Sequence, residues 1–290
     1  MGHVVDKEVK RADKRVDARA VKQLVDKSCS KPVGKVFLVG AGPGDPELLT
    51  IKAVKAIACA DVILIDDLVN PAILEYAAKP ARIIHVGKRG GCRQTPQAFI
   101  ERLMLAEAQT GHCVVRLKGG DPFIFGRGGE ERDHLLAEGI AVEVINGISS
   151  GLAAPASIGI PLTHRDWTQG AVFITGHGKT PDANPDWHTL AKLDLTLVIY
   201  MGVARCAQIQ AALLAGGKSA ATPVAVIQSA TGIAQAQLIT TLATLADDLV
   251  VSGIGSPAII VIGEVVRCAT SFVLDELHAS AQEATSSLCA

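Results

Sequence analysis

From residue 34 onward, short apolar runs alternate with segments whose apolar residues recur at helical spacing. The runs KVFLVG, DVILID, ARIIHVG, HCVVRLKGG and AVEVING predict five buried strands. Segments such as PELLTIKAVKAIACA, PQAFIERLMLAEAQT and GGEERDHLLAEG predict the helices between them. Thr95 before Pro96 matches the order of an N-cap residue followed by proline at the first helical position. This alternation predicts a parallel sheet with helices on both faces.

The pattern changes after the stretch GISSGLAAPASIGIPLTHRD. The runs AVFITGHG, LTLVIYMG, PVAVIQSA, QLITTLATL and PAIIVIGEVV predict strands with little helix between some of them, which favours a mixed sheet. We therefore expect two α/β domains, residues 34–148 and 149–270, which join in a stretch rich in Gly, Ser, Ala and Pro. Residues 1–33 are expected to form a flexible charged tail, and residues 271–290 a frayed C-terminal tail.

Composition narrows the function classes. The chain has 290 residues, of which 49% are apolar, and its formal net charge of −1 argues against a general nucleic-acid binder. No apolar run reaches the length of a membrane span, so we expect no membrane insertion. The N-terminal stretch KEVKRADKRVDARAVKQLVDKS could be an organelle address, but its acidic residues favour a solvated tail.

The spacing of the cysteines and histidines does not indicate a metal site or a redox motif. The seven cysteines include no CxxC pair, and no signal peptide precedes them, which favours a reducing cytoplasm. Cys92, in a polar loop, is the one cysteine that we would test for reactivity. The histidines show no metal-ligand spacing, so no metal site is expected.

The stretch VFLVGAGPGDPELLT places three glycines directly after an apolar strand. A dinucleotide fingerprint needs glycine at its first, third and sixth positions, and the sixth position here is Asp45. Pro43 removes a backbone N–H that a pyrophosphate would use, which favours a ligand without phosphates. An NAD site stays open as an alternative, because Asp66 follows the second strand where a ribose-binding carboxylate could lie. A plain tight turn, with Asp45 as the N-cap of a helix that begins at Pro46, is the other alternative.

A second glycine-rich loop, RLKGGDPFIFGRGGEE, also follows an apolar strand. Loops at the carboxyl ends of parallel strands are where open α/β sheets bind ligands. Gly119 and Gly120 permit a close backbone approach, and Asp121 could bind a pair of hydroxyls. Asp121 followed by Pro122 could instead open an ordinary turn.

The motifs VGAGPGDPELLT, RLKGGDPFIFGRGGEE, GIPLTHRD, ITGH and YMG occur in this order. As a set they resemble the tetrapyrrole methylase superfamily, and within it the uroporphyrinogen-III C-methyltransferases, over about residues 34–266. The resemblance implies two α/β domains with S-adenosylmethionine (SAM) bound in the cleft between them, in a homodimer. The implied reaction is C-methylation of uroporphyrinogen III at C2 and C7. It gives precorrin-2, through precorrin-1, and S-adenosylhomocysteine (SAH), for sirohaem, cobalamin or haem d1 biosynthesis.

The resemblance also implies cofactor-binding positions in both domains. Ser149 and Ser150 stand where the family commonly has Thr-Ala, and Ala230 stands where it often has glycine. The loop GKRGGCRQTPQ also departs from the family's more usual sequence. The implied set is Pro43, Gly119, Gly120, Asp121, Ile124, Ser149, Ser150, Met201 and Ala230.

A polycarboxylate macrocycle requires cationic side chains, because Arg forks match carboxylates in geometry. The strand-end loops of the first domain are rich in Lys and Arg, including Arg116 and Lys118. About half of these cations are expected to be solvated surface charges. The implied substrate-binding set is Lys88, Arg89, Arg93, Arg127, Arg165 and Met201.

Methyl transfer to an electron-rich pyrrole carbon requires no activated Ser or Cys. The protein must align carbon, methyl and sulfur, and a base near the ring is useful once the macrocycle has become cationic. Arg127 and Glu130 are three apart at a predicted helix start, so Arg127 is expected to orient the substrate and Glu130 to handle the proton. Asp66 is a further candidate acceptor. Glu130 as an ordinary acidic residue in a first helical turn is the alternative.

Three other functions stay open at this stage. They are a methylase of a later corrin precursor, an NAD-dependent oxidoreductase and a non-catalytic tetrapyrrole carrier.

Overall fold

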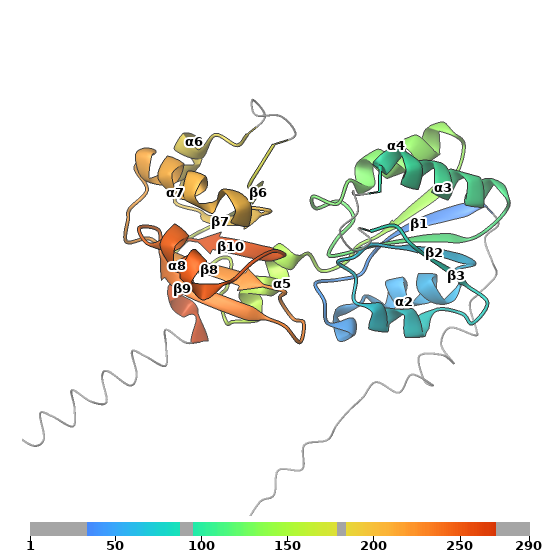
Figure 1. Cartoon of the computed structure of the whole chain (residues 1–290), viewed down its shortest axis with the longest axis horizontal. Helices are drawn as coiled ribbons and strands as arrows, with labels where there is room; N and C mark the ends of the chain where they lie inside the picture. The colour runs from blue at the N-terminus through green and yellow to red at the C-terminus, as the bar shows by residue number, and fades with distance from the viewer. Residues whose placement is uncertain (1–33, 88–94, 179–183, 271–290) are drawn as a thin grey trace, which may run out of the picture.

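The computed structural model describes residues 34–87, 95–178 and 184–270, which form two α/β units (Figure 1). The predictions for the two tails, and for Lys88, Arg89, Cys92 and Arg93, lie outside the described residues. The change from one unit to the other falls between strands β5 and β6.

The first unit alternates strands and helical segments as the apolar pattern predicts. Its strands are β1 (Lys35–Gly40), β2 (Val62–Ile65), β3 (Arg82–His85), β4 (Val114–Lys118) and β5 (Ala141–Ile145). Its helical segments are η1 (Pro46–Leu48), α2 (Ile51–Ala58), η2 (Pro71–Tyr76), α3 (Gln97–Gln109) and α4 (Gly128–Ala137).

All pairings in the first sheet are parallel, in the order β3-β2-β4-β1-β5. Ile57 of α2 is buried against one face with Leu117 of β4. Met104 of α3 and Leu135 of α4 are buried against the other face, and Figure 1 shows α2 on one side of the sheet and α3 with α4 on the other. The predicted parallel sheet with helices on both faces is confirmed, and the carboxyl ends of its strands share one edge.

The second unit contains a mixed sheet of order β6-β7-β10-β8-β9. Its strands are β6 (Ala171–Thr175), β7 (Thr196–Tyr200), β8 (Pro223–Gln228), β9 (Ala236–Thr241) and β10 (Ala258–Ile262). Its helical segments are α5 (Ser150–Ala156), α6 (Trp187–Ala191), η4 (Val203–Arg205), α7 (Cys206–Ala215), α8 (Leu245–Ser252) and η5 (Glu264–Cys268). The mixed sheet predicted for this half is confirmed.

The strand directions in the second sheet place three loops at one edge. β6 runs parallel to β7, and β10 runs antiparallel to both β7 and β8. The carboxyl ends of β6, β7 and β8 therefore lie along the same edge. One face of this sheet is covered by α6, α7 and α8, and the other by α5 and η5.

Two predictions of helix starts have different outcomes. The Asp45 carboxylate accepts a hydrogen bond from the Glu47 backbone N–H at 2.8 Å, with Pro46 at the first position of η1, as predicted. The prediction that Thr95 caps α3 is wrong. Pro96 has extended backbone (φ −59°, ψ 135°) and is itself the N-cap residue, so α3 begins one residue later without a side-chain cap.

No helix in the described part of the chain has both the length and the apolar character to cross a membrane. Cys113 and Cys206 are buried, and Cys206 and Cys268 carry free thiols. Cys59 is disulfide-bonded, which the cysteine pattern did not predict.

Candidate active site between the two sheets

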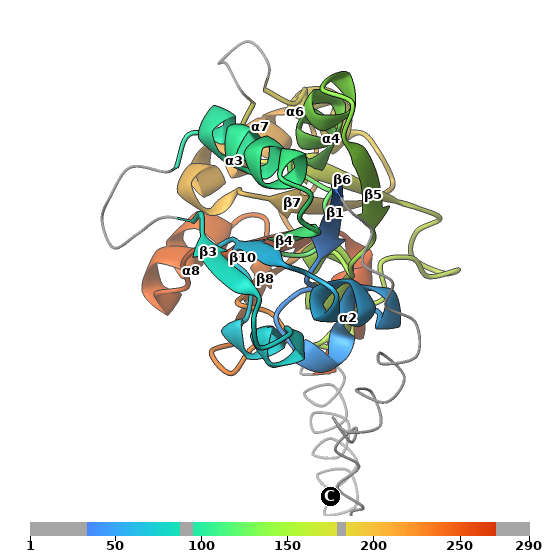
Figure 2. The same ribbon diagram turned by 90° about the vertical axis from the view of Figure 1, so that its right-hand side faces the viewer.

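The two sheets face each other through the edges at which β1, β4, β7 and β8 end. The Asp45 backbone N–H in the loop after β1 donates to Thr231 Oγ1, after β8, at 3.1 Å. The ring of Phe125, after β4, lies 4.7 Å from that of Tyr200 at the end of β7. Figure 2, viewed from the side of the first unit, shows the strands of the first sheet in front of β7, β8 and β10. The loops that carry the predicted cofactor positions therefore lie between the two sheets.

The two glycine-rich loops are hydrogen-bonded to each other. The Gly42 N–H donates to the Gly120 carbonyl at 3.2 Å, and the Gly120 N–H donates back to the Gly42 carbonyl at 2.7 Å. A Cβ on Gly40 would lie 2.4 Å from the Gly147 nitrogen, and one on Gly147 would lie 2.2 Å from the Gly120 oxygen. No side chain fits at these positions, so the glycines are needed for backbone packing whatever they bind.

Asp121 organises the second loop. Its Oδ1 accepts from the Phe123 N–H at 2.8 Å, the hydrogen bond of an ordinary turn opener. Its Oδ2 accepts from Asn146 Nδ2 at 3.1 Å and from the Gly147 N–H at 3.2 Å. The turn alternative for this carboxylate is therefore correct, and a ligand contact at Asp121 stays a prediction.

Arg127 and Glu130 pair at the start of α4. Arg127 Nε lies 3.1 Å from Glu130 Oε1, and Nη2 lies 2.5 Å from Oε2, with both side chains more than half exposed. The hydrogen bonds that Arg127 donates to the Glu130 carboxylate raise the pKa of the guanidinium. The two side chains lie on the same side of the helix start, as their spacing predicts.

Arg116 and Lys118 are not free cations. Their side chains are 2% and 5% exposed, and both contact the fully buried Glu131 carboxylate. Arg116 Nη2 also donates to Asp66 Oδ1 at 2.6 Å. The expectation that Arg116 and Lys118 belong to a cationic surface for carboxylates is wrong. The physical reason is that both side chains are buried and that their acidic partner lies on the next helix.

Residues in the left-handed backbone region gather in the loops between the sheets. Within the described ranges, the non-glycine residues with positive φ are Phe125, Arg127, Met201, Ser229 and Thr231. Such conformations cost free energy and tend to occur where a site requires them. Met201, a predicted cofactor position, is one of these residues, and Ala230, another, lies between two of them. The backbone strain is therefore an independent indication of a site there.

The structure brings the predicted cofactor positions of both units together. A Cβ on Gly44, beside Pro43, would lie 3.1 Å from the Ala230 oxygen, and one on Gly120 would lie 3.6 Å from the Ser150 nitrogen. Ile124 and Met201 are 39% and 46% exposed, so both offer apolar surface outside the cores.

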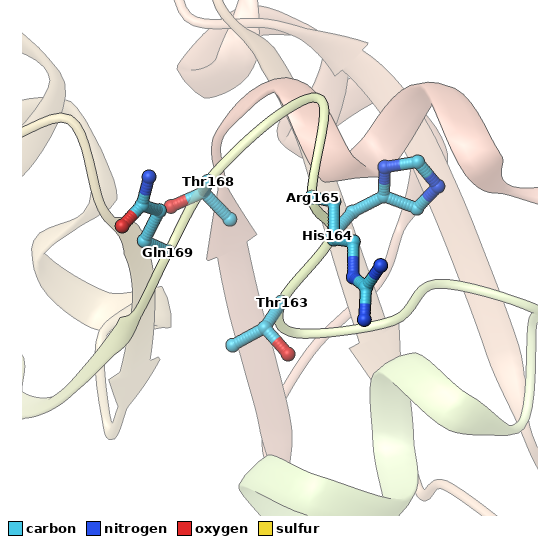
Figure 3. A pocket seen from close by; sticks show the side chains of 5 residues that line it. All are labelled: Thr163, His164, Arg165, Thr168 and Gln169. Carbon is cyan, nitrogen blue, oxygen red and sulfur yellow. The ribbon is translucent and has the colours of Figure 1, made fainter.

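Arg165 is not brought to this group. Its loop precedes β6, and Thr168 of the same loop donates to the Asp194 carbonyl, just before β7 begins. This is the opposite edge of the second sheet from Met201. Arg165 lines an open hollow of about 500 Å³ together with four other residues, shown in Figure 3. The lining residues are Thr163, His164, Arg165, Thr168 and Gln169.

Sequence reasoning missed several side chains that hold the loops. Asn70 Nδ2 donates to the Gly44 carbonyl at 2.8 Å. The Tyr200 hydroxyl contacts Ser149 Oγ at 2.7 Å and accepts from the Gly151 N–H at 2.8 Å. Tyr200 and Thr231 could have been suspected, because each stands next to a motif residue, whereas no local signal marks Asn70.

The chain matches the model of the tetrapyrrole (corrin/porphyrin) methylases over residues 35–246. It is 56% identical over 235 residues to a uroporphyrinogen-III C-methyltransferase of Pseudomonas aeruginosa, which covers 81% of this chain and 95% of the relative. It is 50% identical to the enzyme of the same name from Bacillus subtilis over 81% of this chain and 92% of that one. It is also 52% identical to siroheme synthase 2 of Aeromonas hydrophila over 81% of its own length, and spans about half (49%) of that longer protein.

The fold of this chain is also similar to solved structures of methyltransferases that act on tetrapyrroles. A uroporphyrin-III C-methyltransferase from Thermus thermophilus, complexed with S-adenosylhomocysteine, aligns with a TM-score of 0.69 at 40% identity, covering 80% of this chain and 99% of the other. A cobalt precorrin-4 methyltransferase of cobalamin biosynthesis aligns with a TM-score of 0.72 at 30% identity, covering 80% and 96%.

Proposed function

Because the chain belongs to the tetrapyrrole (corrin/porphyrin) methylase family, we propose that it methylates uroporphyrinogen III with SAM as the methyl donor. The reaction adds methyl groups at C2 and C7, forms precorrin-1 and then precorrin-2, and releases SAH. The main support for this function is that the motif loops after β1 and β4 of the first sheet contact each other and the loop after β8 of the second sheet. The chain that contains them is 56% identical to a uroporphyrinogen-III C-methyltransferase.

The residues between the sheets fit SAM. Bare backbone at Gly119 and Gly120 lies beside the turn that contains Pro43, which lacks the N–H that a phosphate would use. Exposed Ile124 offers an apolar contact from the first unit, and exposed Met201 offers one from the second. When bound, SAM supplies an electrophilic methyl group on its sulfonium. The chain's own contribution is to bind this donor and to exclude water from the reacting atoms, and such alignment can supply roughly 7–11 kcal/mol of the barrier.

The SAM-binding proposal also includes Asp121, Ser149, Ser150 and Ala230. The side chains of Ser149 and Asp121 are engaged in protein hydrogen bonds, so their backbone atoms are the available contacts. Ser150 and Ala230, the small residues that depart from the family pattern, lie close to Gly120 and Gly44 of the glycine-rich loops.

Arg127 and Glu130 are proposed to act on the macrocycle. The paired guanidinium is exposed and bears a positive charge that a substrate carboxylate can share. Glu130 is the proposed acceptor for the proton that the methylated ring must lose. Asp66 is also proposed as an acceptor, and its Oδ1 already accepts a hydrogen bond from Arg116 Nη2.

The remaining substrate contacts are proposals from the family resemblance. Lys88, Arg89 and Arg93 lie outside the described residues, and Arg165 lies at the far edge of the second sheet. A homodimer is likewise proposed from the family resemblance. A cytoplasmic location is proposed from the absence of CxxC pairs in the sequence. The disulfide at Cys59 is the one observation that argues against a reducing compartment.

A mass measurement tests the function. The purified chain is incubated anaerobically with SAM and uroporphyrinogen III, and the product is expected to carry two added methyl groups with SAH released. Arg127→Ala and Glu130→Gln are each expected to lower turnover by about 100-fold or more, with SAH affinity unchanged. Full turnover in both variants would overturn the catalytic assignment, and a wild-type chain that transfers no methyl group would overturn the function.

The same assay separates the closest alternative. A methylase of a later corrin precursor would leave uroporphyrinogen III unmodified and methylate a precorrin instead. The chain is similar to a cobalt precorrin-4 methyltransferase, which is the reason for testing this alternative. The sequence identity to that enzyme is 30%, however, against 56% to a uroporphyrinogen-III C-methyltransferase. The NAD-dependent alternative is set aside, because the matched family is a methylase family.

A further inference from the structure

The loop that carries Arg127 and Glu130 is closed at its base by a buried ion pair. Lys118 is the last residue of β4, and Glu131 lies in the first turn of α4. Lys118 Nζ donates to Glu131 Oε1 at 2.9 Å, and the two side chains are 5% and 0% exposed. The pair therefore joins the point where the chain leaves the sheet to the point where it enters the helix.

Glu131 collects further donors from neighbouring elements. Its Oε1 also accepts from Gln97 Nε2 of α3 at 2.9 Å and from Arg116 Nε of β4 at 3.4 Å. We call Gln97, Arg116, Lys118 and Glu131 the loop-base cluster. Burial lowers the pKa of Lys118, and the Glu131 carboxylate acts against that shift. Glu131 Oε1 is thus the acceptor that Lys118 and Arg116 share beneath the loop, and Asp66 is a second partner of Arg116.

The loop above this cluster is strained where the function needs it. Arg127 has φ 58°, and its carbonyl accepts from the Glu131 N–H at 3.2 Å. Gly128 approaches Pro122 so closely that a Cβ on it would lie 2.4 Å from the Pro122 oxygen. Strained backbone persists only where the surrounding structure holds it on both sides. On the helix side of the loop, the buried ion pair between Glu131 and Lys118 provides such a restraint.

We propose that Glu131 is a positioning residue, which fixes the start of α4 against β4 and thereby holds Arg127 and Glu130 in the orientation that methyl transfer requires. The inference rests on the proposed function. Glu131 is fully buried, so it acts through its neighbours and touches no ligand.

Steady-state kinetics of Glu131→Gln test the inference. The variant keeps the shape of the side chain and removes its charge. It is expected to lower kcat by about 10- to 100-fold, because small misplacements of catalytic groups have effects of this size, while the KM for SAM changes less than about threefold. Glu138→Gln, an exposed residue at the end of the same helix, is the matched control and is expected to keep wild-type kinetics.

A double-mutant cycle separates positioning from a general structural role. If Glu131 acts through Arg127, then Glu131→Gln is expected to cause little further loss of kcat in the Arg127→Ala background. An equal fold-loss of kcat in both backgrounds would overturn the inference.

A second double variant separates positioning from instability. Glu131→Gln combined with Lys118→Met removes the uncompensated buried charge, and is expected to recover Tm without recovering kcat. Recovery of kcat together with Tm would assign Glu131 to stability alone. This variant also serves if Glu131→Gln by itself fails to fold. An inactive wild-type chain would count against the proposed function, whereas an active wild type with full kcat in Glu131→Gln would count against this inference alone.

Discussion

At the residue scale, the glycines of the two loops are explained by close contact of backbone atoms. Gly40, Gly120 and Gly147 come from the ends of three neighbouring strands, and each packs against the backbone of another. The loops after β1, β4 and β5 therefore form one unit of structure. The binding of a ligand that contacts one of these loops therefore depends on the positions of all three.

The substitution Gly147→Ala tests this packing. Its Cβ would lie 2.2 Å from the Gly120 oxygen, so the backbone must shift. We expect a loss of about 1–3 kcal/mol in the free energy of unfolding, together with weaker SAH binding, measured by urea denaturation and calorimetry. The matched control is Gly129→Ala in α4, where a Cβ meets nothing within 4 Å. Equal stability of the two variants would contradict the packing argument.

The Cys206 thiol is expected to make the free energy of unfolding depend on pH. Burial raises the pKa of its thiol from 9.0 to about 11, so the folded state holds this proton more tightly than the unfolded state. The stabilisation is fully present below pH 9 and is lost as the pH rises through 11. The difference in unfolding free energy between the wild type and Cys206→Ala is therefore expected to shrink from pH 8 to pH 11, measured by denaturant titration at each pH. A constant difference would contradict the assignment.

At the element scale, β7 is tied to the start of α5 by one hydroxyl. Tyr200 contacts Ser149 Oγ and accepts the Gly151 N–H, so it joins the second sheet to the helix that follows the first unit. Its ring also packs against Phe125 from the loop after β4. Burial raises the pKa of this hydroxyl, so it stays protonated at neutral pH. Tyr200 therefore sets the position of neighbouring Met201 relative to the first sheet.

Removal of this hydroxyl in Tyr200→Phe is expected to cost about 1–3 kcal/mol, because the Gly151 N–H loses its acceptor in a buried setting. SAH affinity is expected to fall as well, since Ser149 and Met201 flank the proposed site. Calorimetric unfolding and SAH titration measure the two effects. Tyr76→Phe, in η2 of the first unit, is the control, and unchanged SAH affinity in Tyr200→Phe would argue against the coupling.

At the scale of the whole molecule, each sheet has its own two cores, and the units meet through loops at facing edges. A ligand between these edges contacts both units, so its binding is expected to stabilise the second unit as well as the first. The chain has two tryptophans, Trp167 and Trp187, and both belong to the second unit. Their fluorescence therefore reports that unit alone.

SAH at 100 times its dissociation constant is expected to stabilise the tryptophan-monitored transition by about 2.7 kcal/mol. Ile124→Asp, an exposed change in the first unit, is expected to abolish this shift without altering stability in the absence of SAH. The measurement is urea unfolding followed by fluorescence. A shift that persists in Ile124→Asp would contradict the proposed contact between SAH and Ile124.

The sequence by itself determined the two sheets, their parallel and mixed character and the loops that carry the motifs. It could do so because apolar periodicity and strand-end glycines are local signals. The placement of Arg127 and Glu130 on one side of a helix start was also predictable, because their spacing of three residues is a local signal. Tertiary structure alone decided that Arg116 and Lys118 are buried partners of Glu131 and that the Asp121 carboxylate braces a neighbouring loop. It also decided that Arg165 lies at the opposite edge from Met201. Each of these depends on contacts between residues 13 to 26 positions apart, which meet only once the strand-end loops have folded. Periodicity carries no information about which side chain in a neighbouring element neutralises a charge.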